Sequence, residues 1–385
     1  MNANTYDVVI IGSGSVGTPT AMFLARVGYR VLVLDALHSN GQGSNKHAIG
    51  GIRATHSDPA KIYLCNSSIK IFSTWEATYG DDIEWHAGGY SFVAYDSQTE
   101  RSLKDLLVIQ KKAGLNIDWK TPQELKQVIN GLNMDGLLGG TFSPEDGYAS
   151  PLKSNFAFYT QAVKAGAEFH FNEKVIAIHV EDHQIRSVQT DKGEYECKWL
   201  INAAGSWAAE VSKLAGITVP VRPDSHEALV TEPVAHFMEP MIVDLRRRSG
   251  SANFYFYQNA DAQLVGCQTP DPQIWGDLQN ETSEFLPQIC RRLIEVIPSL
   301  ANLRIRRTWR GTYPMTPDGS PILGEVDDLK GYLLAVGTCG QGFMLGPGVG
   351  QILCHLIQGN ISPEEKACLH DLRLDRSFVD EEKLG

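Results

Sequence analysis

The chain of 385 residues is 43% hydrophobic and 21% charged, and its formal net charge is −11. This length allows two domains with a sizeable core. The acidic balance argues against a nucleic-acid-binding protein, because phosphate backbones are held by clustered lysines and arginines. The one basic run, Arg246-Arg247-Arg248, is short, and we expect it to form a solvated turn.

Seven cysteines are scattered along the chain without a CxxC pair, so the sequence predicts neither a metal site nor a disulfide framework. No stretch approaches the roughly 20 apolar residues of a membrane span, and residues 1–7 are too polar for a signal peptide. We therefore expect reduced thiols and a cytoplasmic location, with peripheral attachment to a membrane as the alternative.

Residues 7–11 are a β-branched run without polar alternation, which predicts a parallel strand buried on both faces. The run leads into Gly12-Ser13-Gly14-Ser15-Val16-Gly17, a G-x-G-x-x-G motif. A helical stretch over 18–28 and a second strand over 30–34 follow, and that strand ends in Asp35. This order of strand, loop, helix, strand and acid predicts a Rossmann-type dinucleotide-binding fold.

Each residue of this motif has a physical role. Gly12 permits the tight turn, Gly14 lets a pyrophosphate approach the backbone, and Gly17 lets the helix pack close to the strand. The helix N-terminus offers free N–H groups to the pyrophosphate. Asp35 can accept hydrogen bonds from ribose hydroxyls and disfavours a 2′-phosphate, so NADP is not expected. The motif alone does not separate FAD from NAD.

The rest of the chain alternates helices and strands. Helices are predicted over 60–80, 100–114, 122–130, 151–166, 285–297 and, beginning near Pro347, over 346–357. Strands are predicted over 169–180 and 185–190 as a hairpin, and over 198–205, 229–230, 254–257 and 331–336. Strand-to-glycine-to-helix junctions near residues 12, 205 and 337 would hold an extended dinucleotide from several sides.

Six segments together resemble the D-amino-acid-oxidase-like superfamily of FAD-dependent oxidoreductases, nearest the branch of sarcosine oxidase and the dye-linked proline dehydrogenase β-subunit. They are residues 12–35, 43–53, 146–151, 202–207, 316–324 and 340–344. The resemblance implies an α/β protein with a Rossmann-type FAD-binding domain on a parallel sheet. It also implies a second, α+β substrate domain whose large antiparallel sheet covers the flavin. We place the discontinuous FAD-binding domain at 1–80, 146–215 and 316–385, and the substrate domain at 81–145 and 216–315.

The resemblance also implies which residues contact the two ligands. The cofactor contacts are Gly12, Gly14, Ser15, Gly17, Asp35, Ser44, Asn45, Lys46, Gly51, Ile52, Val175, Ala203, Gly205, Trp207, Gly337, Gly340, Gln341, Gly342, Phe343 and Met344. The substrate contacts are Arg53, Tyr255, Tyr257 and Met344. No residue is assigned as a catalytic acid or base, and Arg53 and Tyr257 are expected to position the substrate.

Arg53 matches the position at which the family holds a substrate carboxylate, and its planar fork suits a bidentate contact. The alternative is a structural arginine paired with Asp58. Tyr255 and Tyr257 share one face of their strand, so either could close the pocket or be an ordinary packed aromatic residue. His47 and His56 are expected to be structural histidines, with a base or a covalent flavin anchor as the alternatives.

Three positions depart from the sarcosine oxidase pattern. Gly311 stands where the family has a cysteine that tethers the flavin, and Leu264 stands where a lysine activates dioxygen. Met344 replaces a second carboxylate-binding lysine. These departures predict non-covalent FAD, an acceptor other than oxygen, and a larger share of carboxylate recognition for Arg53.

The resemblance therefore predicts FAD-dependent oxidation of a small amino acid or secondary amine such as proline, hydroxyproline or sarcosine. Hydride would pass from the α-C–H to flavin N5, and electrons would leave to a partner subunit, a quinone or a dye. One alternative is a peroxide-forming oxidase in which Lys46 or Arg53 replaces the missing lysine. Another is an FAD-binding subunit of an electron-transfer complex, and a 2-hydroxy acid would also suit an arginine clamp.

Overall fold

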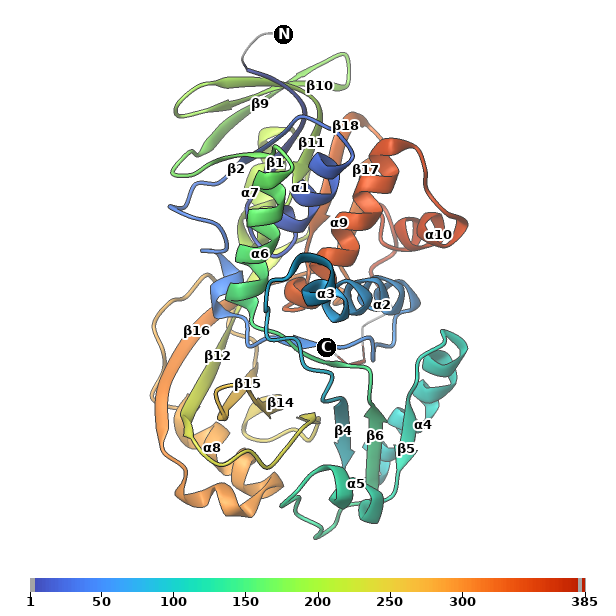
Figure 1. Cartoon of the computed structure of the whole chain (residues 1–385), viewed down its shortest axis with the longest axis vertical. Coiled ribbons are helices and arrows are strands. Elements are labelled where there is room, and N and C mark those ends of the chain that lie inside the picture. Colours follow the sequence, from blue (N-terminus) through green and yellow to red (C-terminus); the bar gives the residue numbers. More distant parts are fainter. Residues whose placement is uncertain (1–3, 380–382, 385) are drawn as a thin grey trace.

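The computed structural model describes residues 4–379, 383 and 384, and these form two lobes, each built on an eight-stranded sheet (Figure 1). In the first sheet, five neighbouring strands run parallel. They are β18 (Leu329–Val336), β11 (Glu194–Asn202), β1 (Thr5–Ile11), β2 (Val31–Leu34) and β8 (Glu168–His170). Antiparallel partners extend it, namely β17 (Ile322–Val326) beside β18, and β9 (Val175–Glu181) beside β10 (Gln184–Thr190).

Both faces of the parallel sheet are buried. Val8 and Ile10 of β1 pack into one apolar cluster, whereas Val9 and Ile11 pack into the cluster on the other face. On the first face lie α1 (Gly17–Arg26), α2 (Pro59–Ser73), α3 (Trp75–Tyr79), α6 (Pro151–Lys164), α9 (Gly342–Gln358) and α10 (Pro363–Asp371). Helix α7 (Ala208–Leu214) lies on the second face. This double cover explains the unbroken apolar run at the start of the chain.

The second sheet has the order β16, β12, β15, β14, β13, β4, β6 and β5, and it is antiparallel except where β13 meets β4. Its strands are β4 (Tyr90–Ala94), β5 (Asp118–Lys120), β6 (Gly139–Ser143), β12 (Arg222–Pro233), β13 (Met241–Asp244), β14 (Gly250–Gln258), β15 (Gln263–Asp271) and β16 (Ile305–Met315). Helices α4 (Ser97–Lys112), α5 (Pro122–Val128) and α8 (Phe285–Val296) pack against it. A short pair, β3 (Gly51–Ile52) and β7 (Gly147–Tyr148), completes the strands of the described residues.

This architecture confirms the predicted fold class of parallel and antiparallel sheets with helices. The strands of the first sheet lie within 1–80, 146–215 and 316–385, and those of the second lie within 81–145 and 216–315. The exact limits of the two domains stay a prediction, and residues 1–3, 380–382 and 385 of those ranges lie outside the described part of the chain.

Three predicted elements differ from the structure. The helix expected over 60–80 is divided at Thr74 into α2 and α3. The strand expected over 169–180 is in fact β8 and β9, separated by a turn in which Asn172 has φ +53°. The first piece pairs with β2 in parallel, and only the second forms the hairpin with β10. Helix α9 begins at Gly342, before Pro347, because its first turn buries Phe343 and Met344.

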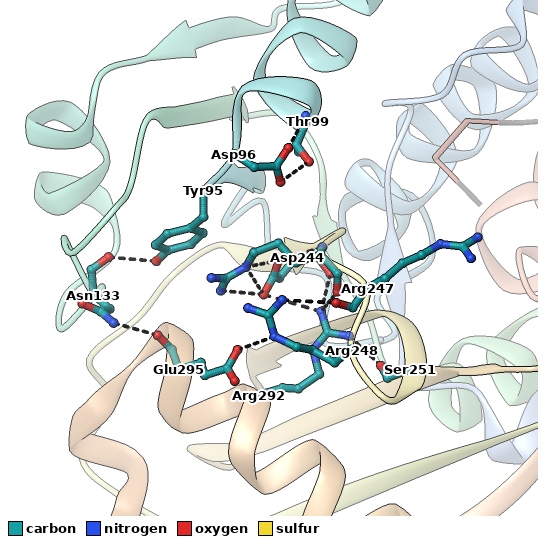
Figure 2. A network of polar contacts seen from close by, with 11 residues as sticks. Tyr95, Asp96, Thr99, Asn133, Asp244, Arg247, Arg248, Ser251, Arg292 and Glu295 are labelled. Atoms are coloured by element: carbon teal, nitrogen blue, oxygen red, sulfur yellow. Dashed lines mark hydrogen bonds and ion pairs between the residues drawn. The ribbon is translucent and has the colours of Figure 1, made fainter.

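The prediction of a solvated turn at Arg246-Arg247-Arg248 is wrong for its first residue. The Arg246 Nη2 atom lies 2.8 Å from the Oδ2 atom of the fully buried Asp244, and Arg292 of α8 approaches the same carboxylate at 3.5 Å. Arg248 pairs with Glu295, and Arg247 is largely exposed (Figure 2). The charges tie the end of β13 to α8, because a buried carboxylate needs close cationic partners.

Candidate cofactor and substrate site

A cavity of about 720 Å³ is lined by residues of both sheets, and its size is typical of ligand sites. The segments that follow β1, β11 and β18 all line it. These three strands are parallel neighbours, so their carboxyl ends open at one edge of the sheet. Ligands of doubly wound sheets bind at this kind of edge. The predicted convergence of the glycine junctions near residues 12, 205 and 337 is therefore observed.

The glycines of the first junction have different surroundings. A Cβ added to Gly12, whose φ is +103°, would collide with the carbonyl oxygen of Ala203, and one added to Gly17 would collide with the carbonyl of Gly12. A Cβ on Gly14 would meet no protein atom within 4 Å. Gly12 and Gly17 thus allow the backbone to pack, whereas Gly14 leaves open space in the cavity where a pyrophosphate fits.

Asp35 lies at the cavity and orders the loop beside it. Its Oδ2 atom accepts hydrogen bonds from the Ser13 backbone N–H at 2.8 Å and from the Ser13 hydroxyl at 2.6 Å, and its Oδ1 accepts from the Leu37 N–H. The carboxylate is therefore fixed in place at the edge of the cavity. A fixed acceptor suits the ribose contact predicted for it.

The structure brings most of the predicted cofactor residues together around the cavity. Those that line it are Gly12, Gly14, Ser15, Asp35, Ser44, Asn45, Gly51, Val175, Ala203, Gly205, Trp207, Gly337, Gly340, Gln341, Gly342, Phe343 and Met344. Three others do not line it: Gly17 packs against Gly12, Lys46 is exposed, and Ile52 is fully buried in the core. Direct cofactor contact stays a prediction for the first group.

The lining has polar groups that await a partner. Among the described residues, the buried Asn45 Oδ1 and Gln341 Oε1 atoms have no hydrogen-bond partner within the protein. Buried polar atoms are normally paired, so a polar ligand would satisfy them. Helix α9 also begins at the cavity with Gly342, and its N-terminus brings unpaired N–H groups and positive potential. These features fit a bound dinucleotide with an anionic flavin edge.

Arg53 lines the cavity and is only 6% exposed. Its Nη1 atom donates to the Thr55 carbonyl and lies 3.2 Å from His56 Nδ1, and its Nη2 atom donates to the Leu384 carbonyl. Asp58, the alternative partner, instead accepts from Ala60 N–H and the Ser320 hydroxyl. No carboxylate among the described residues forms an ion pair with Arg53, so its charge is available to an anionic ligand.

The two tyrosines predicted at the substrate have different positions. Tyr255 lines the cavity, and its hydroxyl hydrogen-bonds the hydroxyl of Tyr313. Tyr257 does not line the cavity, since its hydroxyl donates to the Ile49 carbonyl and its ring packs on Tyr148 with centroids 4.5 Å apart. Tyr257 therefore holds the segment that precedes β3 and is not positioned to close the pocket.

The structure locates all three departures, and Met344 lines the cavity. Gly311 lines the cavity opposite His47, whose side chain would collide with a Cβ at that position. Leu264 does not face the cavity, because it packs on the α8 side of its strand, whereas Cys267 and Thr269 line the cavity. The prediction that Leu264 stands over the flavin is wrong, since one residue of register moves a side chain to the other face of a sheet.

The sequence reasoning missed a histidine at the cavity. His226 stacks on Tyr313 with ring centroids 3.8 Å apart, and its Nε2 atom lies 3.0 Å from Asp224 Oδ2. Burial lowers the pKa of His226, but hydrogen bonds to Asp224 and Cys267 outweigh it and raise the pKa above the ordinary value. An acid two residues before a histidine in a strand was the available signal.

The fold and the cavity define a two-domain oxidoreductase that binds a dinucleotide across the carboxyl ends of a parallel sheet. The chain belongs to the family of FAD dependent oxidoreductases, whose model matches residues 7–356. The cofactor of this family is FAD, and the predicted membership and cofactor are both confirmed. The described residues hold no group of three metal-ligating side chains. None of their helices is long and apolar enough to span a bilayer.

Curated relatives include sarcosine dehydrogenase and dimethylglycine dehydrogenase. The chain is 28% identical to mitochondrial sarcosine dehydrogenase of Mus musculus, over 96% of this chain and 41% of that protein. It is 26% identical to mitochondrial dimethylglycine dehydrogenase of Rattus norvegicus, over 90% of this chain and 42% of that protein. The chain thus spans about two fifths of the length of these relatives. Hydrogen cyanide synthase subunit HcnC of Pseudomonas aeruginosa, 24% identical, matches over 94% of its length and 93% of this chain.

Solved structures agree with this placement. L-proline dehydrogenase from P. horikoshii superposes with a TM-score of 0.88 and 29% identity, covering 94% of this chain and 95% of that chain. Glycine oxidase from Geobacillus kaustophilus has a TM-score of 0.86 at 21% identity, covering 97% of this chain and all of the other. The chain therefore has the fold of these solved structures, in agreement with its membership of the FAD dependent oxidoreductase family.

Proposed function

We propose that this chain oxidises a small amino acid with a secondary amine, of the proline, hydroxyproline or sarcosine type, and passes the electrons to an acceptor other than oxygen. The observation that carries the carboxylate of this substrate is the buried guanidinium of Arg53, which faces the cavity without a carboxylate partner among the described residues. The relatives named sarcosine dehydrogenase and L-proline dehydrogenase support a secondary amine, and the dimethylglycine of a third name is a closely related tertiary amine.

The side chains around the cavity are arranged to hold such a substrate. Arg53 binds the carboxylate through its planar fork, and Tyr255 and Met344 shape the pocket beside it. His226, which pairs with Asp224, adds a hydrogen-bond donor that stays protonated to a higher pH because its pKa is raised. The bound flavin supplies the hydride acceptor. The protein's task is then to fix the α-carbon of the neutral amine and exclude water.

The proposed acceptor follows from the strand that faces the cavity. The cavity-lining residues of β15 are Cys267 and Thr269, neither of which carries a positive charge for oxygen activation. Lys174 is the one lysine among the described lining residues, and it lies next to Glu173, which hydrogen-bonds the Asp35 backbone. That position is beside the dinucleotide loop. A partner subunit, a quinone or an artificial dye is therefore the proposed acceptor.

We further propose that FAD is held without a covalent bond, because Gly311, which lines the cavity, offers no thiol. Acid precipitation of the purified yellow protein should leave the flavin in the supernatant. A yellow pellet would contradict this, and replacement of His47, which lines the cavity, would then identify the tether.

The proposed function is tested by anaerobic titration of the FAD-loaded protein with proline, hydroxyproline, sarcosine, glycine and lactate. Loss of flavin absorbance with the secondary amines is the expected result. Stopped-flow mixing with oxygen should then show slow reoxidation, and a dye should reoxidise the protein rapidly. Fast reoxidation by oxygen that produces hydrogen peroxide would instead indicate an oxidase. A flavin that no substrate bleaches would indicate a subunit whose chemistry depends on a partner.

A further inference from the structure

The segment with Lys383 and Leu384 returns to the substrate side of the cavity, twelve residues after α10 ends at Asp371. The Lys383 backbone N–H donates to the Ser57 hydroxyl at 3.0 Å. Leu384 is 3% exposed and lines the cavity. This segment is therefore held against the loop that follows Arg53.

Leu384 occupies its position through side chain and backbone together. Its side chain belongs to an apolar cluster with Tyr90, Phe92 and Val243, all of which also line the cavity. Its carbonyl accepts a hydrogen bond from Arg53 Nη2, while the Arg53 guanidinium carbon lies 5.3 Å from the centroid of the Phe92 ring. An apolar side chain beside an acceptor oxygen has the chemistry of a small apolar amino acid bound through its carboxylate.

Arg53 has few N–H groups with which to bind both the Leu384 carbonyl and a substrate carboxylate. Nη1 is engaged by the Thr55 carbonyl and His56, so Nη2 is the terminal nitrogen that faces Leu384. A carboxylate that binds a guanidinium side-on needs two N–H groups of the fork. The Leu384 carbonyl and a substrate carboxylate therefore compete for the same edge of Arg53.

We propose that the Lys383–Leu384 segment is a self-inhibitory strap that occupies the carboxylate position at Arg53 and is displaced when an anionic ligand binds. The proposal rests on the role of Arg53 in the proposed function. A neutral carbonyl is the weaker acceptor, because charge-assisted hydrogen bonds are about twice as strong as neutral ones. A carboxylate would therefore displace the strap.

The size of the effect follows from the fraction of molecules in which the strap is open. Ligand affinity is reduced by that fraction, so a strap closed in about 90% of molecules weakens binding about ten-fold. Replacing Leu384 with glycine removes the buried side chain and should raise the open fraction. The matched control is Val379→Gly, since Val379 lies in the same stretch and is 74% exposed.

The experiment measures the Kd of acetate from its perturbation of the flavin spectrum in the FAD-loaded protein, so it needs no turnover. Leu384→Gly, and a second variant that ends at Val379, should bind acetate about ten-fold more tightly than the unmodified chain and Val379→Gly. In an Arg53→Ala background, Leu384→Gly should change nothing. Flavin content and thermal unfolding are checked for each variant.

Equal acetate affinity in all chains would overturn the strap. Weaker binding in Leu384→Gly would overturn it too, because Leu384 would then support the ligand. Failure of the proposed function is separable, since it appears as an unbleached flavin in the amino acid titration. Tighter acetate binding by the Leu384 variants would still support the strap in that case.

Discussion

Gly346 of α9 lies directly against the backbone of Ser15 in the dinucleotide loop, so that a Cβ at Gly346 would overlap the Ser15 carbonyl oxygen. The two residues are 331 positions apart in the sequence. Their contact brings the N-terminus of α9 to the loop after β1, and residues from both line the cavity. The cofactor site therefore depends on a close approach of two backbones that only glycine permits.

Gly346→Ala should weaken both the fold and FAD binding, because the methyl group meets backbone, which cannot move aside as a flexible side chain can. Overpacking of this kind costs about 1–3 kcal/mol or more, so a lower unfolding temperature and loss of bound flavin on gel filtration are expected. Gly193→Ala is the control, since its Cβ would have its nearest neighbour at 3.6 Å. Equal flavin retention in both variants would contradict the argument.

Arg53→Lys should selectively impair substrates with a carboxylate. Lysine keeps the charge but loses the planar fork, and a hydrogen bond to a charged group is worth about 1.5–3 kcal/mol. The KM for proline should therefore rise about 10- to 100-fold, while the activity toward prolinamide changes little. Steady-state kinetics with a dye acceptor provide the measurement, and the exposed Arg306→Lys is the control. A parallel loss for both substrates would instead indicate a structural role.

Local signals made part of this molecule predictable. The strand, glycines, helix and acid of residues 7–35 follow one another directly, so the first βαβ unit could be read from the sequence. The split between β8 and β9 could not, because it depends on pairing with β2, a strand more than 130 residues earlier. Leu264 shows the same limit, since strand register decides which face a residue occupies.

The substrate side of the site was less predictable for a related reason. The position of His226 and Asp224 at the cavity depends on the pairing of β12 with β16, which brings His226 against Tyr313. The contact between Arg53 and Leu384 joins positions 331 residues apart, and no local pattern announces it. A dinucleotide motif is local in the sequence because a single turn forms it. This substrate pocket is instead assembled from strands that lie far apart in the sequence.

Asp224→Asn should shift the pH dependence of carboxylate binding to lower pH. In the unmodified chain, burial lowers the pKa of His226, but the hydrogen bonds to Asp224 and Cys267 raise it by more. Removing the Asp224 charge leaves burial as the main influence, so the imidazolium is lost at a lower pH. The Kd of acetate, measured between pH 5.5 and 9, should begin to rise at a lower pH in the variant than in the unmodified chain. Superimposable profiles would show that His226 does not contribute charge to the site.

Asp146→Asn tests the contribution of a buried carboxyl group that lies against the loop following Arg53, called the Arg53 loop below. Asp146 accepts from the Ala54 N–H at 2.8 Å and the Thr55 hydroxyl at 2.6 Å, yet burial raises its pKa from 3.8 to about 6. Because the folded chain binds this proton more tightly than the unfolded one, its contribution to stability is complete below pH 3.8 and is lost as the pH rises through about 6.

Lowering the pH from 7.5 to 4.5 should therefore favour the unmodified chain over Asp146→Asn by about 2 kcal/mol in unfolding free energy. Urea titrations of both chains at the two pH values measure this difference, and the exposed Asp135→Asn shows how much any lost carboxylate contributes. If the difference in unfolding free energy between the two chains is the same at both pH values, Asp146 stays ionised in the folded chain. Its two hydrogen bonds to the Arg53 loop would then dominate over its burial.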